Sequence, residues 1–219
     1  MRTAVLLLLV AAPLAADDFP RRWRMLYPSQ GPTPLAPADG LKITGPHVEH
    51  PFYLGEHLAS GVWNVEDGRL VSDGSPAVTL GTGEDFELEA VVDATGTGGL
   101  FLLVGHDAEA GRGFGVWNAT MRTSGSPWGA FGYDRGAAVD GTAEELDPFE
   151  WKGEQPLKLS VVGGRVTLVV GPHAVLTDRE MPEYSGGDVV LGAYGTRYGP
   201  RKLKIRAVRA RALPGKKAK

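Results

Sequence analysis

The chain has 219 residues, 23 of them basic and 26 acidic, for a formal net charge of −3, and it contains no cysteine. The lack of cysteine excludes disulfides and thiolate metal sites, and the slight acidic excess argues against nucleic acid as a partner. The 31 glycines and 16 prolines make up about a fifth of the chain, well above the average of about 12%. Turns should therefore be frequent and helices few.

Residues 1–16, MRTAVLLLLVAAPLAA, have the plan of a secretory signal peptide: one basic residue, a short apolar core, and small residues before Asp17. We expect cleavage after Ala16 and a secreted or periplasmic protein. The apolar run is shorter than the roughly 18–20 residues that a spanning helix needs, and no later segment reaches that length. The sequence therefore predicts no membrane span.

Residues 17–51 contain seven prolines and few apolar runs, which predicts an irregular, Pro-rich N-terminal arm lying on the domain that follows. Its Arg21-Arg22-Trp23-Arg24 cluster could bind an acidic surface, or it could be a solvated face with Trp23 tucked into a groove. Leu41–Val48 is a candidate edge strand.

Strand signals begin at Trp63. In Trp63–Val71, Asp67-Gly68 is a preferred dipeptide for the type I′ turn of a β-hairpin. Asp85–Ala94 alternates apolar and acidic side chains, which is typical of a strand with one wet face. The continuous apolar run Leu100–Val104 predicts a central strand that is buried on both faces.

The later part of the chain predicts further strands and a single helical turn. The turn is expected at Ala143–Leu146, with Thr142 as its cap. A slip in the apolar phase near Arg206 predicts a β-bulge in the last strand. The strands are expected at Gly113–Arg122, Trp128–Tyr133, Ala174–Thr177, Asp188–Ala193 and Lys202–Leu213.

The clearest hairpin signal is Pro156–Val170, in which two alternating apolar segments flank Gly163-Gly164. If these glycines form the loop, Leu157 faces Val170, Leu159 faces Leu168, and Val161 faces Val166, all on one side of the hairpin. Such an apolar face has to be covered by a second sheet, because a lone hairpin is only marginally stable.

The predicted fold class is therefore all-β, a two-sheet antiparallel β-sandwich with little or no helix. Its expected extent is residues 52–213, followed by a basic, disordered tail at 214–219.

The order of the strand motifs resembles the 3-keto-disaccharide hydrolase-like domain family. The resemblance rests on the Trp63–Leu70 hairpin, Asp85–Leu88, the strand Gly115–Asn118, the Gly-Gly hairpin, and a closing Lys204–Arg209 segment. It implies a concanavalin A-like lectin/glucanase sandwich, a jelly roll, in a protein that acts on or binds glycosides. It also implies a glycoside hydrolase or lyase activity on 3-keto-glycosides.

The polar centre of that family's site is not matched. Leu100–Val104 lacks the expected Arg, and Gly115 and Trp117 occupy positions where acidic and amide residues are expected. Glycosidic cleavage commonly needs two carboxyl groups about 5–10 Å apart, and Glu87 and Glu89 on one strand face would fit that spacing. Exposed carboxylates on a wet sheet face are far more common than a catalytic pair, so the catalytic residues stay unassigned.

Histidines raise the question of a metal. His47, His50 and His57 lie within eleven residues with Glu49 between them, and imidazole and carboxylate are zinc ligands. The segment matches no familiar motif, so we expect no cofactor, with a divalent ion at these histidines as the alternative. His106-Asp107 follows a buried strand and could be either an orienting pair at a rim or a solvated turn.

Aromatic and polar side chains at strand ends suggest a sugar site, because sugar rings stack on aromatics and their hydroxyl groups bind Asn and Arg. An equally good interpretation makes the tryptophans core residues. The sugar-binding candidates are Trp117, Asn118, Arg122, Trp128, Tyr133, Arg135, Arg197 and Tyr198.

Two functions remain open at this point. One is a secreted carbohydrate-binding or carbohydrate-processing sandwich. The other is a non-catalytic structural or protein-interaction domain of an envelope or extracellular assembly, which would use its Pro-rich arm and sheet edges.

Overall fold

A computed structural model describes residues 19–29, 35–38, 41, 43, 60–95, 99–119, 126–149, 151–194 and 202–214. Several predictions concern residues outside these ranges and stay predictions. They are the signal peptide at 1–16, most of the basic tail, the histidines His47, His50 and His57, and the sugar-binding candidates Arg122, Arg197 and Tyr198. The described part of the chain contains no helix that could cross a bilayer.

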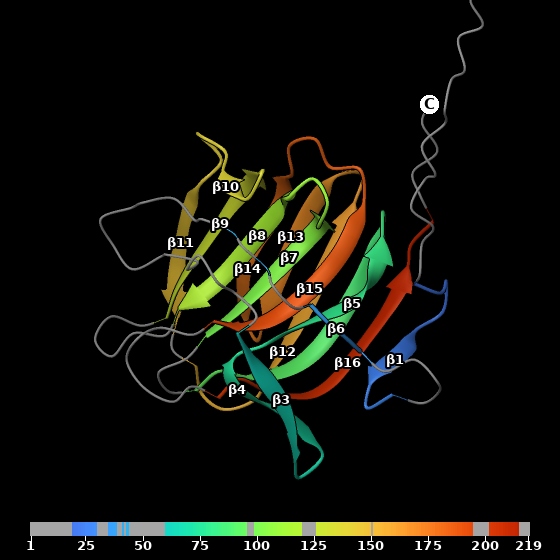
Figure 1. The fold of residues 1–219 in the computed structure, drawn as a ribbon, viewed down its shortest axis with the longest axis vertical. Helices are drawn as coiled ribbons and strands as arrows, with labels where there is room; N and C mark the ends of the chain where they lie inside the picture. Colours follow the sequence, from blue (N-terminus) through green and yellow to red (C-terminus); the bar gives the residue numbers. More distant parts are fainter. Residues whose placement is uncertain are drawn as a thin grey trace, which may run out of the picture.

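The described residues form two antiparallel sheets of eight strands each (Figure 1), which confirms the predicted β-sandwich. Sheet A has the strand order β14-β13-β12-β6-β16-β4-β3, and β1 also pairs with β16. Its strands are β1 (Arg24–Tyr27), β3 (Ser60–Glu66), β4 (Arg69–Ser75), β6 (Phe86–Asp93), β12 (Gln155–Val162), β13 (Arg165–Val170), β14 (His173–Glu180) and β16 (Lys204–Ala212).

Sheet B has the strand order β10-β9-β8-β7-β15-β5-β2, and β11 also pairs with β9. Its strands are β2 (Ala36–Pro37), β5 (Ala77–Gly83), β7 (Gly99–Asp107), β8 (Arg112–Ala119), β9 (Ser126–Asp134), β10 (Ala137–Ala138), β11 (Glu144–Phe149) and β15 (Gly187–Tyr194).

Both predicted hairpins have the register that their turns dictate. In β12–β13, Leu157 pairs with Val170, Leu159 with Leu168, and Val161 with Val166. In β3–β4, the turn residues Asp67 and Gly68 have φ angles of 50° and 72°, the left-handed values that a type I′ turn needs. The predicted bulge is also present, as a register shift between Ile205 and Ala207 where β16 pairs with β6.

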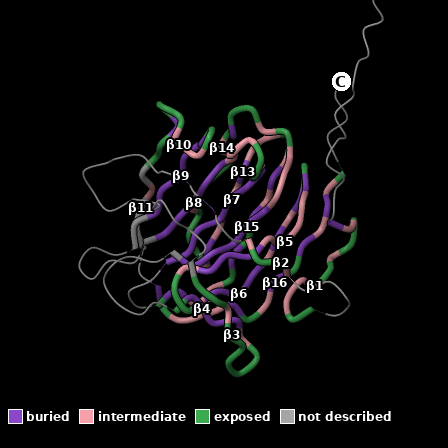
Figure 2. Tube along the Cα trace, viewed as in Figure 1, coloured by how far each residue is buried: buried purple, intermediate pink, exposed green. Residues whose placement is uncertain are grey.

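The main core lies between the two sheets. It is built from the inward side chains of each strand, and β6 shows the pattern clearly, with Phe86, Leu88, Ala90 and Val92 buried and the residues between them half-buried. Figure 2 shows this core as buried strand interiors, with exposed residues gathered in the hairpin turns. Burying alternate side chains of two sheets against each other is what holds a sandwich together.

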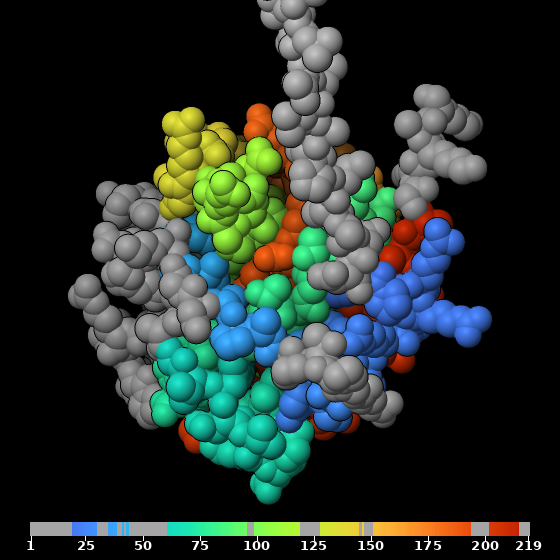
Figure 3. Space-filling model, turned by 45° about the vertical axis from the view of Figure 1, so that its right-hand side comes forward, coloured from blue at the N-terminus to red at the C-terminus, as the bar shows by residue number. Residues whose placement is uncertain are grey.

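The outer face of sheet B carries a second apolar layer, because β7 is buried along both faces as its continuous apolar run predicts. Phe101, Leu103, Trp117, Phe131 and Val190 form this layer. Leu41 and Ile43 of the N-terminal arm pack against the layer. Figure 3 shows the described arm residues 35–38, 41 and 43 in light blue, beside the green and orange atoms of the sheet.

Two expectations need correction. The segment predicted as a helical turn at Ala143–Leu146 is the start of strand β11, because Glu144–Leu146 pairs with Gly129 and its neighbours on β9. Thr142 is not a helix cap; its hydroxyl group contacts the backbone of Gly132 instead. The arm is not irregular throughout either, since β1 pairs with β16 and β2 pairs with β5.

Candidate functional site

The structure buries four of the predicted sugar-binding side chains. Trp117 and Tyr133 are each 2% exposed, and Trp128 and Asn118 are 0% exposed. Trp128 belongs to the main core and Trp117 to the outer layer of sheet B. The interpretation of the tryptophans as core residues is therefore the one that the structure supports, since a sugar ring cannot stack on a side chain that is covered on every side.

Asn118 has a structural partner: its Oδ1 accepts a hydrogen bond of 2.7 Å from Trp151 Nε1 inside the core. Arg135 lies in an exposed turn, with its side chain 90% accessible and 3.9 Å from the Asp134 carboxylate. The predicted aromatic groove is thus not assembled from these residues. Among the described candidates, Tyr133 is the one that lines the larger pocket described next.

That pocket lies at one end of sheet B, near β10 and the β14–β15 loop at the top of Figure 1, and is called here the end pocket. Its volume is about 900 Å³. It forms where β5, β7 and β9 end and β8 and β15 begin, so its lining comes from many strand ends at once. Small-molecule sites in proteins are typically clefts of about 300–1,000 Å³ with a few convergent polar groups.

A row of polar side chains crosses the strands at this end, and we call Thr82, Asp188, His106 and Tyr133 the polar row. Asp188 on β15 is paired with Thr82 on β5 on one side and with His106 on β7 on the other. The Thr82 hydroxyl group donates a 2.7 Å hydrogen bond to Asp188 Oδ1. His106 Nδ1 lies 2.8 Å from the Tyr133 hydroxyl oxygen.

Two glycines make the row and the pocket sterically feasible. Gly113 on β8 lies between the strands that carry His106 and Tyr133, and a Cβ atom there would lie 2.5 Å from the Tyr133 hydroxyl oxygen. Gly105 adopts a φ of +63°, and a Cβ atom there would lie 2.7 Å from the Tyr184 ring. Because only glycine lacks this atom, both positions require it.

The His106–Tyr133 hydrogen bond defines which proton the imidazole offers to a ligand. Tyr133 is almost fully buried, and its hydroxyl group has no other hydrogen-bond partner among the described residues. A buried hydroxyl group has to donate its proton, so it donates to Nδ1 of His106. Neutral His106 then carries its own proton on Nε2, which makes no hydrogen bond within the described part of the chain.

Burial governs the charge states in the row. It lowers the pKa of His106, and the nearby carboxylates of Asp188 and Asp107 offset this only in part. Burial also raises the pKa of Tyr133, and the charge of Asp107 adds to the effect. At neutral pH both side chains are therefore uncharged, and the pair can only donate and accept hydrogen bonds.

Further carboxylates surround the row at the rim. Asp107 Oδ1 accepts the backbone N–H groups of Glu109 and Ala110, at 3.0 and 2.9 Å, which fixes the β7–β8 turn. Its other oxygen lies 3.7 Å from Arg112 Nε. The predicted alternatives for His106-Asp107 are thus both partly met: Asp107 forms the exposed turn, whereas His106 is a buried member of the polar row.

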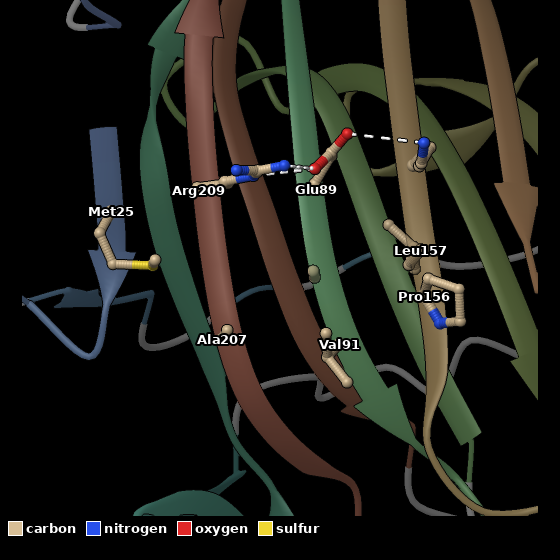
Figure 4. A pocket seen from close by; sticks show the side chains of 9 residues that line it. Met25, Glu89, Val91, Pro156, Leu157, Ala207 and Arg209 are labelled. Carbon is tan, nitrogen blue, oxygen red and sulfur yellow. Dashed lines mark hydrogen bonds and ion pairs between the residues drawn. The ribbon is translucent and has the colours of Figure 1, made fainter. Parts of the chain in front are cut away.

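The outer face of sheet A offers a smaller hollow of about 250 Å³, shown in Figure 4. Met25, Val91 and Pro156 give it aliphatic walls, and Glu89 beside it is paired with Arg209. Lys158 Nζ also lies 3.7 Å from Glu89. Glu89 is thus paired with both Lys158 and Arg209, so none of these described charges is left to orient a ligand in the hollow.

Ion pairs on this face also involve Glu87 and Glu89, the two carboxylates considered above as a catalytic pair. Glu87 Oε2 accepts a 2.7 Å hydrogen bond from Arg211, and Glu89 is held by Arg209. Trp23 lies over both guanidinium groups, 4.7 Å from that of Arg209 and 4.8 Å from that of Arg211. The two carboxylates belong to a structural network on this face, and no acid–base function follows from their spacing.

No group of three or more His, Asp or Glu side chains within the described ranges converges in a way that could hold a metal ion. The carboxylates of the end pocket are spread around its lining instead. The histidine-based metal prediction concerns His47, His50 and His57, on which the structure is silent.

Sequence reasoning placed Tyr133 and His106 in separate hypotheses and missed that they touch. Thr82, Asp188 and Tyr184 were not singled out as site residues at all. The usable signal was the position of these residues beside glycines at strand ends, but the pairing order of the strands was needed to bring them together.

Comparison with known proteins identifies the fold. No family model and no curated protein matches the sequence. Similar solved structures include the carbohydrate-binding module CBM66 from Bacillus subtilis, with 17% identity, a TM-score of 0.51, and coverage of 70% of this chain and 92% of that one.

The metal-free Emp46p carbohydrate recognition domain has 11% identity and a TM-score of 0.52, covering 69% of this chain and 86% of that one. An endo-β-galactosidase from Clostridium perfringens has 12% identity and a TM-score of 0.52, and the match covers 72% of this chain and 55% of that one. At these identities the likeness establishes a jelly-roll sandwich of the kind found in carbohydrate-binding and glycosidase domains.

The lowered pKa of His106 predicts a pH-dependent stability. Below about pH 6.5 the unfolded chain takes up a proton at this residue that the folded protein resists, so the free energy of unfolding falls as the pH falls. In His106→Gln this contribution is lost. Across the acid range, the difference in unfolding free energy between parent and variant should change by up to about 1.4 kcal/mol per pH unit.

Urea unfolding of both proteins between pH 7 and pH 5 measures this difference. His173→Gln, on the exposed part of β14, is the matched control and should retain the pH slope of the parent. An equal slope in His106→Gln and the parent would contradict the assignment.

Proposed function

We propose that this protein binds carbohydrate and holds it in the end pocket. The observation that carries the proposal is the polar row, a set of hydrogen-bonding groups from β5, β15, β7 and β9 that faces a pocket of about 900 Å³. Sugar hydroxyl groups need donors and acceptors at fixed positions, and a rigid sheet end supplies them. The similarity to the folds of CBM66 and the Emp46p carbohydrate recognition domain supports the same class of ligand.

The polar residues of the lining can form hydrogen bonds with a sugar, and the apolar residues can pack against its ring. His106 donates a hydrogen bond from Nε2–H to a sugar oxygen, and Asp188 Oδ2, the oxygen that does not bond Thr82, accepts a hydrogen bond from a sugar hydroxyl group. Val139 and Pro182 give the pocket apolar surface, against which the C–H face of a sugar ring can pack. Tyr184 is held in place by its hydroxyl group, which lies 2.8 Å from the carbonyl oxygen of Glu84.

Removing one member of the polar row should weaken glycan binding. We expect Asp188→Asn and His106→Ala each to lower the affinity about fivefold to tenfold, because each loses a hydrogen bond in a partly desolvated pocket. Titration calorimetry on the best ligand from a glycan array measures the effect, with circular dichroism as the check on folding.

Trp23→Ala is the control, since the aromatic ring of Trp23 lies over Arg209 and Arg211 of β16, on the opposite sheet. Loss of binding in Trp23→Ala alone would move the site to sheet A. If the parent protein bound no glycan at all, the proposal would fail, and the alternative of a structural or protein-interaction domain would take its place.

We also propose, as a second function of the same pocket, action on 3-keto-glycosides, in line with the motifs shared with the 3-keto-disaccharide hydrolase-like family. Such a reaction needs a base to remove the acidic proton next to the keto group. Asp188 is the favoured base, because the Nε2 atom of His106 already carries a proton.

This function predicts turnover of a 3-keto-glucoside by the parent protein and a loss of at least about 100-fold in Asp188→Asn. The Trp23→Ala variant should turn over the substrate at the parent rate. Binding of the keto-sugar without turnover would leave a binding protein and end the catalytic proposal.

We further propose that the protein acts outside the cytoplasm, because residues 1–16 have the plan of a signal peptide. Protein recovered from the periplasm or medium should begin at Asp17 when its N-terminus is sequenced. Protein that keeps Met1 and stays in the cytoplasm would contradict this proposal.

A further inference from the structure

The end pocket carries a large excess of negative charge. Five of its lining residues are acidic and one, Arg112, is basic, whereas His106 is neutral at pH 7. The acidic residues come from three separate segments of the chain. They are Asp107, Glu109, Asp134, Glu183 and Asp188.

Most of this charge is not neutralised by neighbouring side chains. Asp107 and Asp134 each have an arginine within 4 Å. Within the described part of the chain, Glu109, Glu183 and Asp188 form no ion pair. The pocket thus gathers three carboxylates that form no ion pair among the described residues, whereas Glu87 and Glu89 on the outer face of sheet A are each bound by arginine.

Two observations indicate what kind of cation would neutralise this charge. The described carboxylates and histidines do not converge on one point, as a metal ion would require. The pocket lining also holds a hydrogen-bond donor that a ligand can use: His106 is 7% exposed, and its Nε2–H group has no partner among the described residues. A ligand that satisfies both features carries spread positive charges together with hydroxyl oxygens.

We propose that the end pocket selects cationic carbohydrates, namely oligosaccharides of amino sugars whose amino groups are free and protonated. This inference rests on the proposed glycan binding and names its ligand class. The ammonium groups would lie against Asp188, Glu183 and Glu109, while a ring oxygen or hydroxyl group accepts a hydrogen bond from His106 Nε2–H. N-acetylation removes the positive charge, and uronic acids replace it with a negative one that the pocket repels.

Three oligosaccharides of matched length test the selection: a glucosamine hexamer, its fully N-acetylated form, and a galacturonate hexamer. Titration calorimetry at pH 6 and low salt should show the glucosamine hexamer binding at least about fivefold more tightly than the acetylated form, since several partly exposed charge pairs form. The uronate should bind most weakly. The advantage of the cationic hexamer should shrink at 0.5 M NaCl, because salt screens such pairs.

The variant Glu109→Gln/Glu183→Gln should lose most of this preference while still binding the acetylated hexamer as the parent does. Asp67→Asn/Asp73→Asn is the matched control: it also removes two exposed carboxylates, from the β3–β4 hairpin outside the pocket lining, and should keep the preference. An equal loss in this control would show that net protein charge attracts the polycation without a site, and it would overturn the inference.

The two proposals fail in different ways. If the acetylated and free hexamers bind equally well, or the uronate binds best, the charge selection is wrong and the glycan-binding function stands. If none of the three binds and no neutral glycan binds either, the proposed function itself has failed.

Discussion

Sheet B is buried on both of its faces, and this constraint decides where a ligand can bind. One face packs against sheet A, and the other carries Phe101, Trp117 and Phe131 beneath Leu41 and Ile43 of the N-terminal arm. A double-sided apolar sheet removes the broad open face on which a sandwich could hold a ligand. The polar row therefore lies at the ends of the strands, where the apolar layers end and side chains can contact solvent.

Tyr133 connects these two regions of the molecule. Its ring belongs to the outer apolar layer, 6.1 Å from that of Phe131, while its hydroxyl group bonds His106 in the polar row. A buried hydrogen bond of this kind is costly to break, because the partner left behind would be a desolvated polar group. The packing of the outer layer thus fixes the position of the imidazole and, through Nδ1, the proton that it presents.

Local patterns in the sequence were enough to predict the strands and their hairpins, because alternation and turn chemistry act over a few residues. The Gly163-Gly164 hairpin has the predicted register for this reason. The helical turn at Ala143–Leu146 was wrong because its acidic residues are compatible with either structure, and pairing with β9 decided the outcome. The site was beyond such reasoning, since His106 and Tyr133 are 27 residues apart and lie on strands separated by β8.

The tryptophans show a second limit of local sequence patterns: they were candidates for the site, but the structure places them in the core. On a strand with one wet face, alternation separates core from surface. Along β7, β8 and β9 both faces are covered, so the pattern gave no signal that Trp117 on β8 and Trp128 on β9 are buried. The same geometry explains why similarity of fold at 11–17% sequence identity says so little about the residues of the site. Many sequences with apolar residues at alternate positions can form the two sheets. The end pocket depends instead on individual residues such as Gly105, Gly113 and Asp188, which the fold does not determine.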